Sequence, residues 1–419
     1  DGVVEARLLQ ILVLARRGRA DGLGADVLAE LKRRETDAPR WGPPPRDGAT
    51  AAAFAARKMA PFALEWDERK HFPIDVLREA AELGMGAVYC GDDVGGSGLR
   101  RLDGVRIFEQ LAYADPAVAA FLSIHNMCAA MIDGFGTEEQ RSTWIPRLAS
   151  MQTVASYCLT EPGAGSDAAA LATRAERDGD EYVLTGVKQF ISGAGASDLY
   201  VVMARTGGPG PKGISTFLVE KDCAGLSFGA QERKMGWHAQ PTAQVILDGV
   251  RVPAANLLGG TEGIGFTIAM SGLNGGRLNI AAASLGGAQA AFDKAASYVA
   301  DRRAFGGALI DEPTVRFTLA DMMTGLHTSR LTLWAAATAL DEGAPDKVEQ
   351  CAMAKRYVTD TCFTVADQAL QLHGGYGYLT EYGLEKIVRD LRVHRILEGT
   401  NEIMRVVLGR SVAARFKDN

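Results

Sequence analysis

The spacing of hydrophobic residues changes twice along the chain. From residue 50 to about 151, apolar residues recur every three or four positions, as in "PIDVLREAAELGM". Between 153 and 263 they alternate with polar residues in short runs such as "GISTFLVEK", and after 265 the spacing of three and four returns. The first spacing is typical of helices that bury one face, and alternation is typical of strands. The pattern predicts helices, then strands, then helices, without the βαβ alternation of a parallel sheet.

The predicted domains follow these changes. The fold class is mainly α with a β middle domain, which we expect to be a small antiparallel β-barrel or sandwich. Four long helical segments with short joints after it predict a C-terminal four-helix bundle, at residues 266–303, 313–341, 345–373 and 401–416. The predicted boundaries are 1–49 for an N-terminal segment, 50–153 for an N-terminal α-helical domain, 154–265 for the β domain and 266–419 for the C-terminal bundle.

The N-terminal segment 1–49 carries no interpretable signal. It contains the basic stretches "ARRGRA" and "LKRR", but acidic residues are interleaved with them, whereas transit peptides are poor in acids. The stretch "RWGPPPRDG" is typical of a linker. We predict no role for this segment.

Composition restricts the class of protein. Hydrophobic residues make up 47% and charged residues 23% of the 419, which is typical of a globular chain. A formal charge of -6 does not favour nucleic-acid binding. No apolar run approaches the ~20 residues that a membrane span needs, so we expect a soluble protein with no membrane insertion. The six cysteines and six histidines are scattered, which predicts a reducing compartment and no metal.

Several enzyme signatures are missing from the sequence. It has no GxGxxG at a strand-to-helix turn, no GxxxxGK[ST], no HExxH and no GxSxG. The sequence therefore does not favour a Rossmann dehydrogenase, a P-loop enzyme, a zincin or an α/β-hydrolase.

Glycine-rich joints lie at the edges of the β region and in the C-terminal helices. Taken one at a time, "YCLTEPGAGSD" (157–167) and "KQFISGAG" (188–195) are typical of tight turns. "GLNGGR" (272–277) places glycines inside a helical pattern, where each costs about 1 kcal/mol relative to alanine, so something must approach this helix closely.

Glu398 lies in "RILEGTNEIMR", just before a predicted helix. An acid there favours the helix dipole, with Thr400 or Asn401 as the N-cap, and spacing alone leaves a structural acid and a catalytic base both open.

In this order on an α-β-α chain, "YCLTEPGAGSD", "KQFISGAG", "DRRAFGG", "QLHGGYGY" and "RILEGTNEIMR" resemble the acyl-CoA dehydrogenase family. The resemblance runs from about Phe54 to Phe416. It implies FAD between the β domain and the bundle, with an acyl-CoA thioester against the flavin. It also implies a homotetramer in which a neighbouring subunit contributes residues 371–375 to the FAD site.

The resemblance implies a role for particular residues. Many relatives have Trp-Ile-Thr where this chain has Phe-Ile-Ser at 190–192, and a frequent FAD-contacting Gln is replaced by Pro313. The expected cofactor-binding residues are Tyr157, Cys158, Leu159, Thr160, Ser166, Phe190, Ile191, Ser192, Arg302, Phe305, Gln371, Leu372, His373, Gly374, Gly375, Thr400, Asn401 and Glu402. The expected substrate-binding residues are Ser166, Asn274, Gly275, Gly276, Arg277 and Arg410.

The family places its catalytic base at one of two positions, and this chain fills one of them. One is the Glu before Gly-Thr, matched by Glu398. The other, used by isovaleryl-CoA and long-chain members, corresponds to Gly276, which has no carboxylate. The resemblance therefore implies Glu398 as the base.

The activity implied is FAD-dependent α,β-desaturation of a short branched acyl-CoA thioester. "HNMCAAMID" and "GGPGPKGIS" point to isobutyryl-CoA of valine breakdown, with electrons passed to electron-transferring flavoprotein. A 2-methylbutyryl-CoA or butyryl-CoA substrate stays open, since one methylene discriminates only about 10 to 200-fold. An acyl-CoA oxidase is less favoured, and a non-catalytic scaffold is the alternative of another class. The implied compartment is the mitochondrial matrix in a eukaryote or the cytoplasm in a bacterium.

Overall fold

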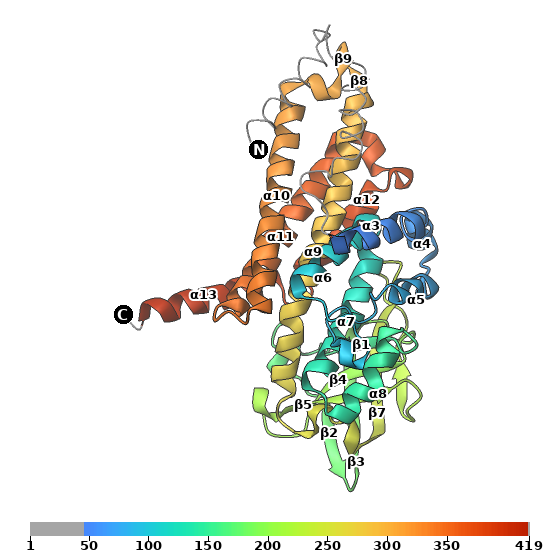
Figure 1. The fold of residues 1–419 in the computed structure, drawn as a ribbon, viewed down its shortest axis with the longest axis vertical. Coiled ribbons are helices and arrows are strands. Elements are labelled where there is room, and N and C mark those ends of the chain that lie inside the picture. Colours follow the sequence, from blue (N-terminus) through green and yellow to red (C-terminus); the bar gives the residue numbers. More distant parts are fainter. Residues whose placement is uncertain (1–45, 418–419) are drawn as a thin grey trace. The chain divides into compact units, whose positions relative to one another are not determined.

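The computed structural model describes residues 46–417, and the description below concerns the unit Asp47–Asn419. All but the end of the predicted segment 1–49 lies outside the described residues. Within the described part, helices precede and follow a β domain (Figure 1), which confirms the predicted fold class.

The N-terminal helical part contains α3 (Arg46–Lys58), α4 (Ala63–Arg69), α5 (Ile74–Glu82), α6 (Arg101–Ala114), α7 (Pro116–Phe135) and α8 (Glu138–Ala149). Local signals fix where the later helices begin. Asp115 accepts hydrogen bonds from the backbone N–H groups of Ala117 and Val118 at the start of α7. Thr137 and Gln140 form a capping box that starts α8.

Helix α7 is the one helix of the described residues that is long and apolar enough to cross a membrane by length and composition alone. In the structure 72% of its apolar window is buried inside the protein. Such burial is typical of a core helix, and α7 packs against α6, α8, α9 and β1.

The β domain is a seven-stranded sheet of β1 (Ala155–Cys158), β2 (Arg174–Asp178), β3 (Glu181–Ser192), β4 (Leu199–Arg205), β5 (Ile214–Glu220), β6 (Leu226–Phe228) and β7 (Thr242–Pro253). The order is β1-β4-β2-β3-β7-β6, with β5 paired to β4. Most pairs are antiparallel, as predicted, but β4 is parallel both to β1 and, at the single pair Arg174–Arg205, to β2. The β2–β3 hairpin lies between β1 and β4 in the chain, so β4 returns in the direction of β1.

The C-terminal part contains α9 (Gly265–Asp301), α10 (Pro313–Asp341), α11 (Lys347–Leu372), α12 (Leu384–Arg392) and α13 (Asn401–Lys417). The four predicted helices agree with α9, α10, α11 and α13 to within two residues at each end. Helix α12 was not predicted, although its apolar residues Leu384, Ile387, Val388 and Leu391 have helical spacing; the sequence analysis missed this signal in a helix of only nine residues. A small hairpin of β8 (Arg303–Ala304) and β9 (Gly307–Ala308) joins α9 to α10.

Helix α9 is the centre of the molecule's packing. It runs from the β domain to the β8–β9 hairpin and contacts α6, α7, α10 and α11 (Figure 1). Most of its residues are buried, and many are alanine or glycine. At Gly286 a Cβ would lie 2.1 Å from the backbone oxygen of Glu109 on α6, so only glycine permits this approach. Helix α9 thereby brings residues 274–277 among α7, α11 and the turn before α13.

Candidate active site

Glu398 lies in the turn between α12 and α13, in an uncommon backbone conformation. Its φ is 57° and that of Gly399 is 86°. A non-glycine residue with positive φ is uncommon and persists only where its surroundings hold it there. Of the two predicted caps, the one that starts α13 is Thr400, whose hydroxyl accepts a hydrogen bond from Ile403 N at 3.2 Å. Glu398 is thus in the turn and not in the helix.

The carboxylate of Glu398 points at the backbone of α9. A Cβ built on Gly276 would lie 2.5 Å from Glu398 Oε2 and 3.0 Å from the thioether sulfur of Met127 on α7. Gly276 therefore makes the space that the carboxylate occupies. The two base positions of the family thus lie against each other in this chain, one as an acid and one as a glycine.

The environment of Glu398 raises its affinity for a proton. The residue as a whole is half-buried, but Oε2 is buried and has no hydrogen-bond partner among residues 46–417. Burial raises the pKa of Glu398 from 4.5 to about 7, against the opposing positive charges of Arg277 and Lys355. A carboxyl group whose pKa lies near the working pH suits general base catalysis. This change cannot be read from sequence, because it depends on residues from α7, α9 and α11.

Arg277 holds the backbone of Glu398 in place. Its side chain is 6% exposed, and its Nε donates to the Glu398 carbonyl oxygen at 3.2 Å. Its Nη1 donates to Asn274 Oδ1 at 2.8 Å, so residues 274, 276 and 277 all belong to the cluster around Glu398. Arg410, in contrast, is exposed on α13, roughly 13 Å along the helix from Asn401 at 1.5 Å per residue. The structure does not bring Arg410 into this cluster.

Tyr157 on β1 lies close enough to Glu398 to interact with its charge. Burial and then the negative charge of Glu398 raise the pKa of Tyr157 well above its ordinary value. The end of β1 continues into the loop predicted to line a flavin. That loop therefore begins beside the candidate base.

A buried ion pair fixes this loop. Lys188 Nζ donates to Glu161 Oε1 at 2.7 Å and to the Leu159 carbonyl at 3.2 Å. Glu161 also accepts from the backbone N–H groups of Ala172 and Thr173, at 2.6 and 3.0 Å. Sequence analysis missed both members of the pair. A single Lys inside the alternating strand "EYVLTGVKQFIS" was the available signal, since a buried cation needs a partner.

The residues predicted to contact the flavin divide into two groups. Phe190 is 65% exposed, with a φ of 59°, and Ser166 is exposed while Thr160 and Ser192 are half-buried. The side chains of Cys158, Leu159 and Ile191 are buried in the protein. Any contact that these three make with a bound ring would come from their backbone.

The loop geometry fits a flat ligand. A Cβ on Gly163 or Gly165 would meet no atom within 4 Å, so the backbone faces open space. The ring of Phe190 is exposed, whereas aromatic rings of this size are normally packed against other side chains. The open glycine backbone and the uncovered ring of Phe190 leave room for a flat ligand such as an isoalloxazine ring.

The residues predicted for the adenine half of FAD lie at the far end of the bundle. The guanidinium of Arg302 lies 5.8 Å from the ring centre of Tyr376, and Phe305 is 91% exposed on the β8–β9 hairpin. Gln371, Gly374 and Gly375 are exposed at the end of α11.

Five other predicted cofactor residues differ in how far their side chains are buried. His373 is buried and stacks on Tyr298 with ring centres 4.3 Å apart. Asn401 is buried and Glu402 is exposed. Leu372 and Thr400 are half-buried. The roles of all of these in binding FAD stay predictions.

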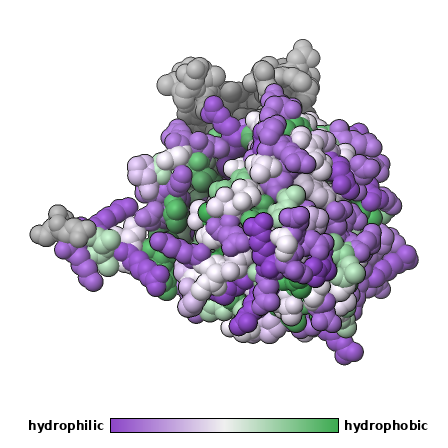
Figure 2. Space-filling view, turned by 90° about the horizontal axis from the view of Figure 1, so that it is seen from below, coloured by the Kyte–Doolittle hydropathy of each residue, from purple (hydrophilic) through white to green (hydrophobic). Residues whose placement is uncertain are grey.

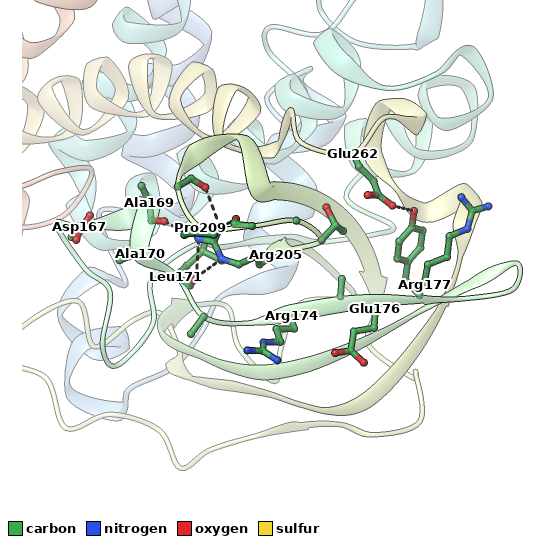
Figure 3. Close-up of a pocket in the computed structure, with 17 residues that line it drawn as sticks. Asp167, Ala169, Ala170, Leu171, Arg174, Glu176, Arg177, Arg205, Pro209 and Glu262 are labelled. Atoms are coloured by element: carbon green, nitrogen blue, oxygen red, sulfur yellow. Dashed lines mark hydrogen bonds between the residues drawn. The ribbon is translucent and has the colours of Figure 1, made fainter.

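A separate hollow of about 1130 Å³ opens on the rim of the β domain (Figure 3). Neither Glu398 nor Arg277 lines it. Arg205 at its centre is already bound, since it donates to the carbonyls of Gly208 and Ala169 at 2.6 and 2.8 Å. It therefore holds two loops together, and we assign the hollow no part in the chemistry.

Three family models match the chain. They are described as the N-terminal, middle and C-terminal domains of acyl-CoA dehydrogenase and match residues 48–152, 156–250 and 263–413. The mitochondrial isobutyryl-CoA dehydrogenase of Dictyostelium discoideum is 55% identical over 87% of this chain and 87% of its own length. That of Bos taurus is 55% identical over 86% of each chain.

A solved structure adds to the likeness. The butyryl-CoA dehydrogenase of Megasphaera elsdenii has a TM-score of 0.86 and 36% identity, and the match covers 88% of this chain and 98% of that one. Coverage of this extent leaves no large part of the described fold unmatched. The chain belongs to the acyl-CoA dehydrogenase family of FAD-dependent oxidoreductases.

Proposed function

We propose that this protein desaturates isobutyryl-CoA to methacrylyl-CoA in valine catabolism, with Glu398 as the catalytic base. The observation that carries the proposal is the buried Oε2 of Glu398, which lies against Gly276 in a chain 55% identical to two isobutyryl-CoA dehydrogenases. The substrate is the finer part of the proposal, and family membership supports the reaction type.

In the proposed reaction the thioester loses the elements of H₂ from its α and β carbons. Glu398 takes the α-proton onto Oε2. Bound FAD would supply the chemistry at the β carbon, as the acceptor of the β-hydrogen with its electron pair. Arg277 fixes the backbone of Glu398, and the burial of Oε2 keeps that carboxylate oxygen from water. A base in a dry site is stronger than the same carboxylate in water.

Within this proposal FAD is held by the predicted residues of the β1 loop, residues 190–192, the β8–β9 hairpin and the end of α11. The glycines that face open space, Gly163, Gly165, Gly374 and Gly375, support it. Ser166 and residues 274–277 would face the acyl-CoA.

We also propose a homotetramer that passes electrons to electron-transferring flavoprotein. Exposed apolar side chains on the C-terminal helices support self-association, because large rings are normally covered: Phe317 is 68% and Phe416 is 76% exposed. Figure 2 shows apolar side chains set among polar ones on one face of the molecule. The mitochondrial relatives support a matrix location in a eukaryote, with the cytoplasm as the bacterial equivalent. The domain boundaries 50–153, 154–265 and 266–419 stay predictions.

The second candidate substrate is another short or 2-methyl-branched thioester. The likeness to a butyryl-CoA dehydrogenase supports butyryl-CoA, and 2-methylbutyryl-CoA differs from the proposed substrate by one methylene. The non-catalytic scaffold is disfavoured, since a scaffold gives no reason to keep an unpartnered buried acid.

The test is an anaerobic titration of the FAD-loaded protein with isobutyryl-, 2-methylbutyryl-, butyryl- and isovaleryl-CoA, in which flavin bleaching is monitored. We expect the highest bleaching rate with isobutyryl-CoA. Glu398→Gln should keep FAD and lose nearly all bleaching, whereas the control Glu139→Gln, at an exposed acid of α8, should bleach like the wild type. Bleaching of the Glu398→Gln protein at the wild-type rate would refute the role of Glu398.

A further inference from the structure

Lys355 is a buried cation that the proposed reaction does not yet use. Its side chain is 0% exposed in the middle of α11, on a face shared with Cys351, Val358 and Cys362. Removing an ammonium group from water is costly unless charged or strongly polar groups replace the water. Such a residue must therefore have partners that fix it.

The partners of Lys355 belong to the turn that carries Glu398. Its Nζ donates to the Gly399 carbonyl at 2.8 Å and to Asn401 Oδ1 at 2.8 Å. Arg277 donates to the Glu398 carbonyl from α9 on the other side. Two successive carbonyls of a turn with positive φ are thus each bound by a cation, one from α9 and one from α11.

Asn401 is itself fixed on α11. Its Nδ2 donates to Thr359 Oγ1 at 3.0 Å and to Asp360 Oδ1 at 2.9 Å. Asp360 in turn accepts from Arg395 at 2.7 Å, in the segment that leads to Glu398. The turn is therefore tied to α11 at several points.

Charge couples Lys355 to the base. Burial lowers the pKa of Lys355 to about 7, the negative charge of Glu398 opposes this, and Arg277 adds to it. Lys355 and Arg277 in turn lower the pKa of Glu398 against its burial. The other titratable and charged groups that interact with Glu398 or Lys355 from the surrounding elements are Tyr157, Cys128, His394, Asp360 and Glu402.

We propose that Lys355 is a positioning residue for Glu398, which holds the 398–399 turn in its left-handed conformation and places a positive charge beside the carboxylate so that it is ionised when substrate binds. The inference rests on the proposed function, because it assigns Lys355 a role through that base. Lys355 touches neither substrate nor cofactor in this role.

The experiment compares the pH dependence of flavin bleaching by isobutyryl-CoA in wild type, Lys355→Met and Lys355→Gln, with FAD content measured alongside. Loss of the cation makes Glu398 harder to ionise. We therefore expect the acid limb of the pH profile to move up by about one pH unit, a roughly tenfold loss of rate below the limb. Lys355→Gln keeps a hydrogen-bond donor at position 355 but removes the positive charge. If Lys355→Met does not bind FAD, the shift of the acid limb is measured with Lys355→Gln instead.

The matched control is Thr359→Val on the same helix. It removes a hydrogen bond from Asn401 but no charge, so its acid limb should stay where the wild type has it. A purely structural role for Lys355 would lower the rate equally at every pH and leave the limb in place, and that result would overturn the inference. Failure of the proposed function looks different, because wild type would then not bleach with any thioester, or Glu398→Gln would bleach normally.

Discussion

At the scale of single residues, the proposed base Glu398 is surrounded by charged groups that come from distant parts of the chain. Family resemblance and the glycine at 276 were enough to name it. Burial raises the pKa of Glu398 to about 7, and the positive charges of Arg277 and Lys355 oppose that rise. Arg277 lies 121 residues earlier in the chain. Lys355 was missed, although a lone lysine among Cys351, Val358 and Cys362 at helical spacing was a usable signal. Sequence names the group, and packing between distant elements sets its chemistry.

Gly276→Ala should lower the rate of flavin bleaching without preventing the protein from folding. The added Cβ would lie 2.5 Å from Glu398 Oε2, so the carboxylate must turn away from its present position. Alanine favours the helix by about 1 kcal/mol, so we expect the protein to fold and bind FAD. Since a displacement of about 1 Å can cost roughly 100-fold, flavin bleaching should slow on that scale. The control is Gly409→Ala on α13, where a Cβ meets no atom within 4 Å. Equal bleaching rates for the two variants would contradict this account.

At the scale of elements, the long helices were predictable because their periodic pattern is local. The parallel pairing of β1 with β4 was not, since Ala155 and Leu199 are partners across 44 positions of chain. The close contact of α9 with α6 could not be predicted either, because the two helices lie far apart in the sequence. The glycines at 272–277 signalled a close approach to α9, but Gly286 was not singled out, and only the structure shows that it meets Glu109.

Gly286→Ala should destabilise the packing of α9 on α6. Its Cβ would lie 2.1 Å from Glu109 O and 2.8 Å from Tyr113 N, and backbone atoms cannot move aside as a flexible side chain can. Forcing an atom into such a contact typically costs about 1 to 3 kcal/mol. We expect a lower Tm by calorimetry at a fixed FAD concentration. Gly134→Ala on α7, where the Cβ would meet open space, should leave Tm unchanged or higher. If both substitutions shift Tm alike, the contact is not what excludes a side chain at 286.

At the scale of the whole molecule, the buried Glu398 that suits the proposed chemistry lowers the stability of the folded protein. Glu398 has its carboxylate oxygen buried without a hydrogen-bond partner among residues 46–417, and burial raises its pKa to about 7. In the folded protein the group therefore keeps its proton up to about pH 7, whereas the unfolded chain releases it near 4.5. The folded state binds more protons in this window, so its stability falls as pH rises from about 4.5 to 7. The pKa of Lys355 is lowered to about 7 in the folded protein. Its contribution therefore makes stability rise with pH, but only above about pH 7.

Glu398→Gln should remove this pH-dependent loss, because glutamine stays neutral like the protonated acid. At about pH 5 wild type and variant should have similar Tm values, and by about pH 7 the variant should be the more stable, by up to about 3 kcal/mol for a pKa raised by roughly 2.5 units. The measurement is Tm against pH at a fixed FAD concentration, since a ligand that binds only the folded state raises Tm by itself. Glu139→Gln, at an exposed acid, should follow the wild-type curve. If Tm changed with pH in the same way for wild type and Glu398→Gln between about pH 4.5 and 7, ionisation of Glu398 would not destabilise the folded protein. The two cations beside Glu398 would then not be needed to offset such a destabilisation.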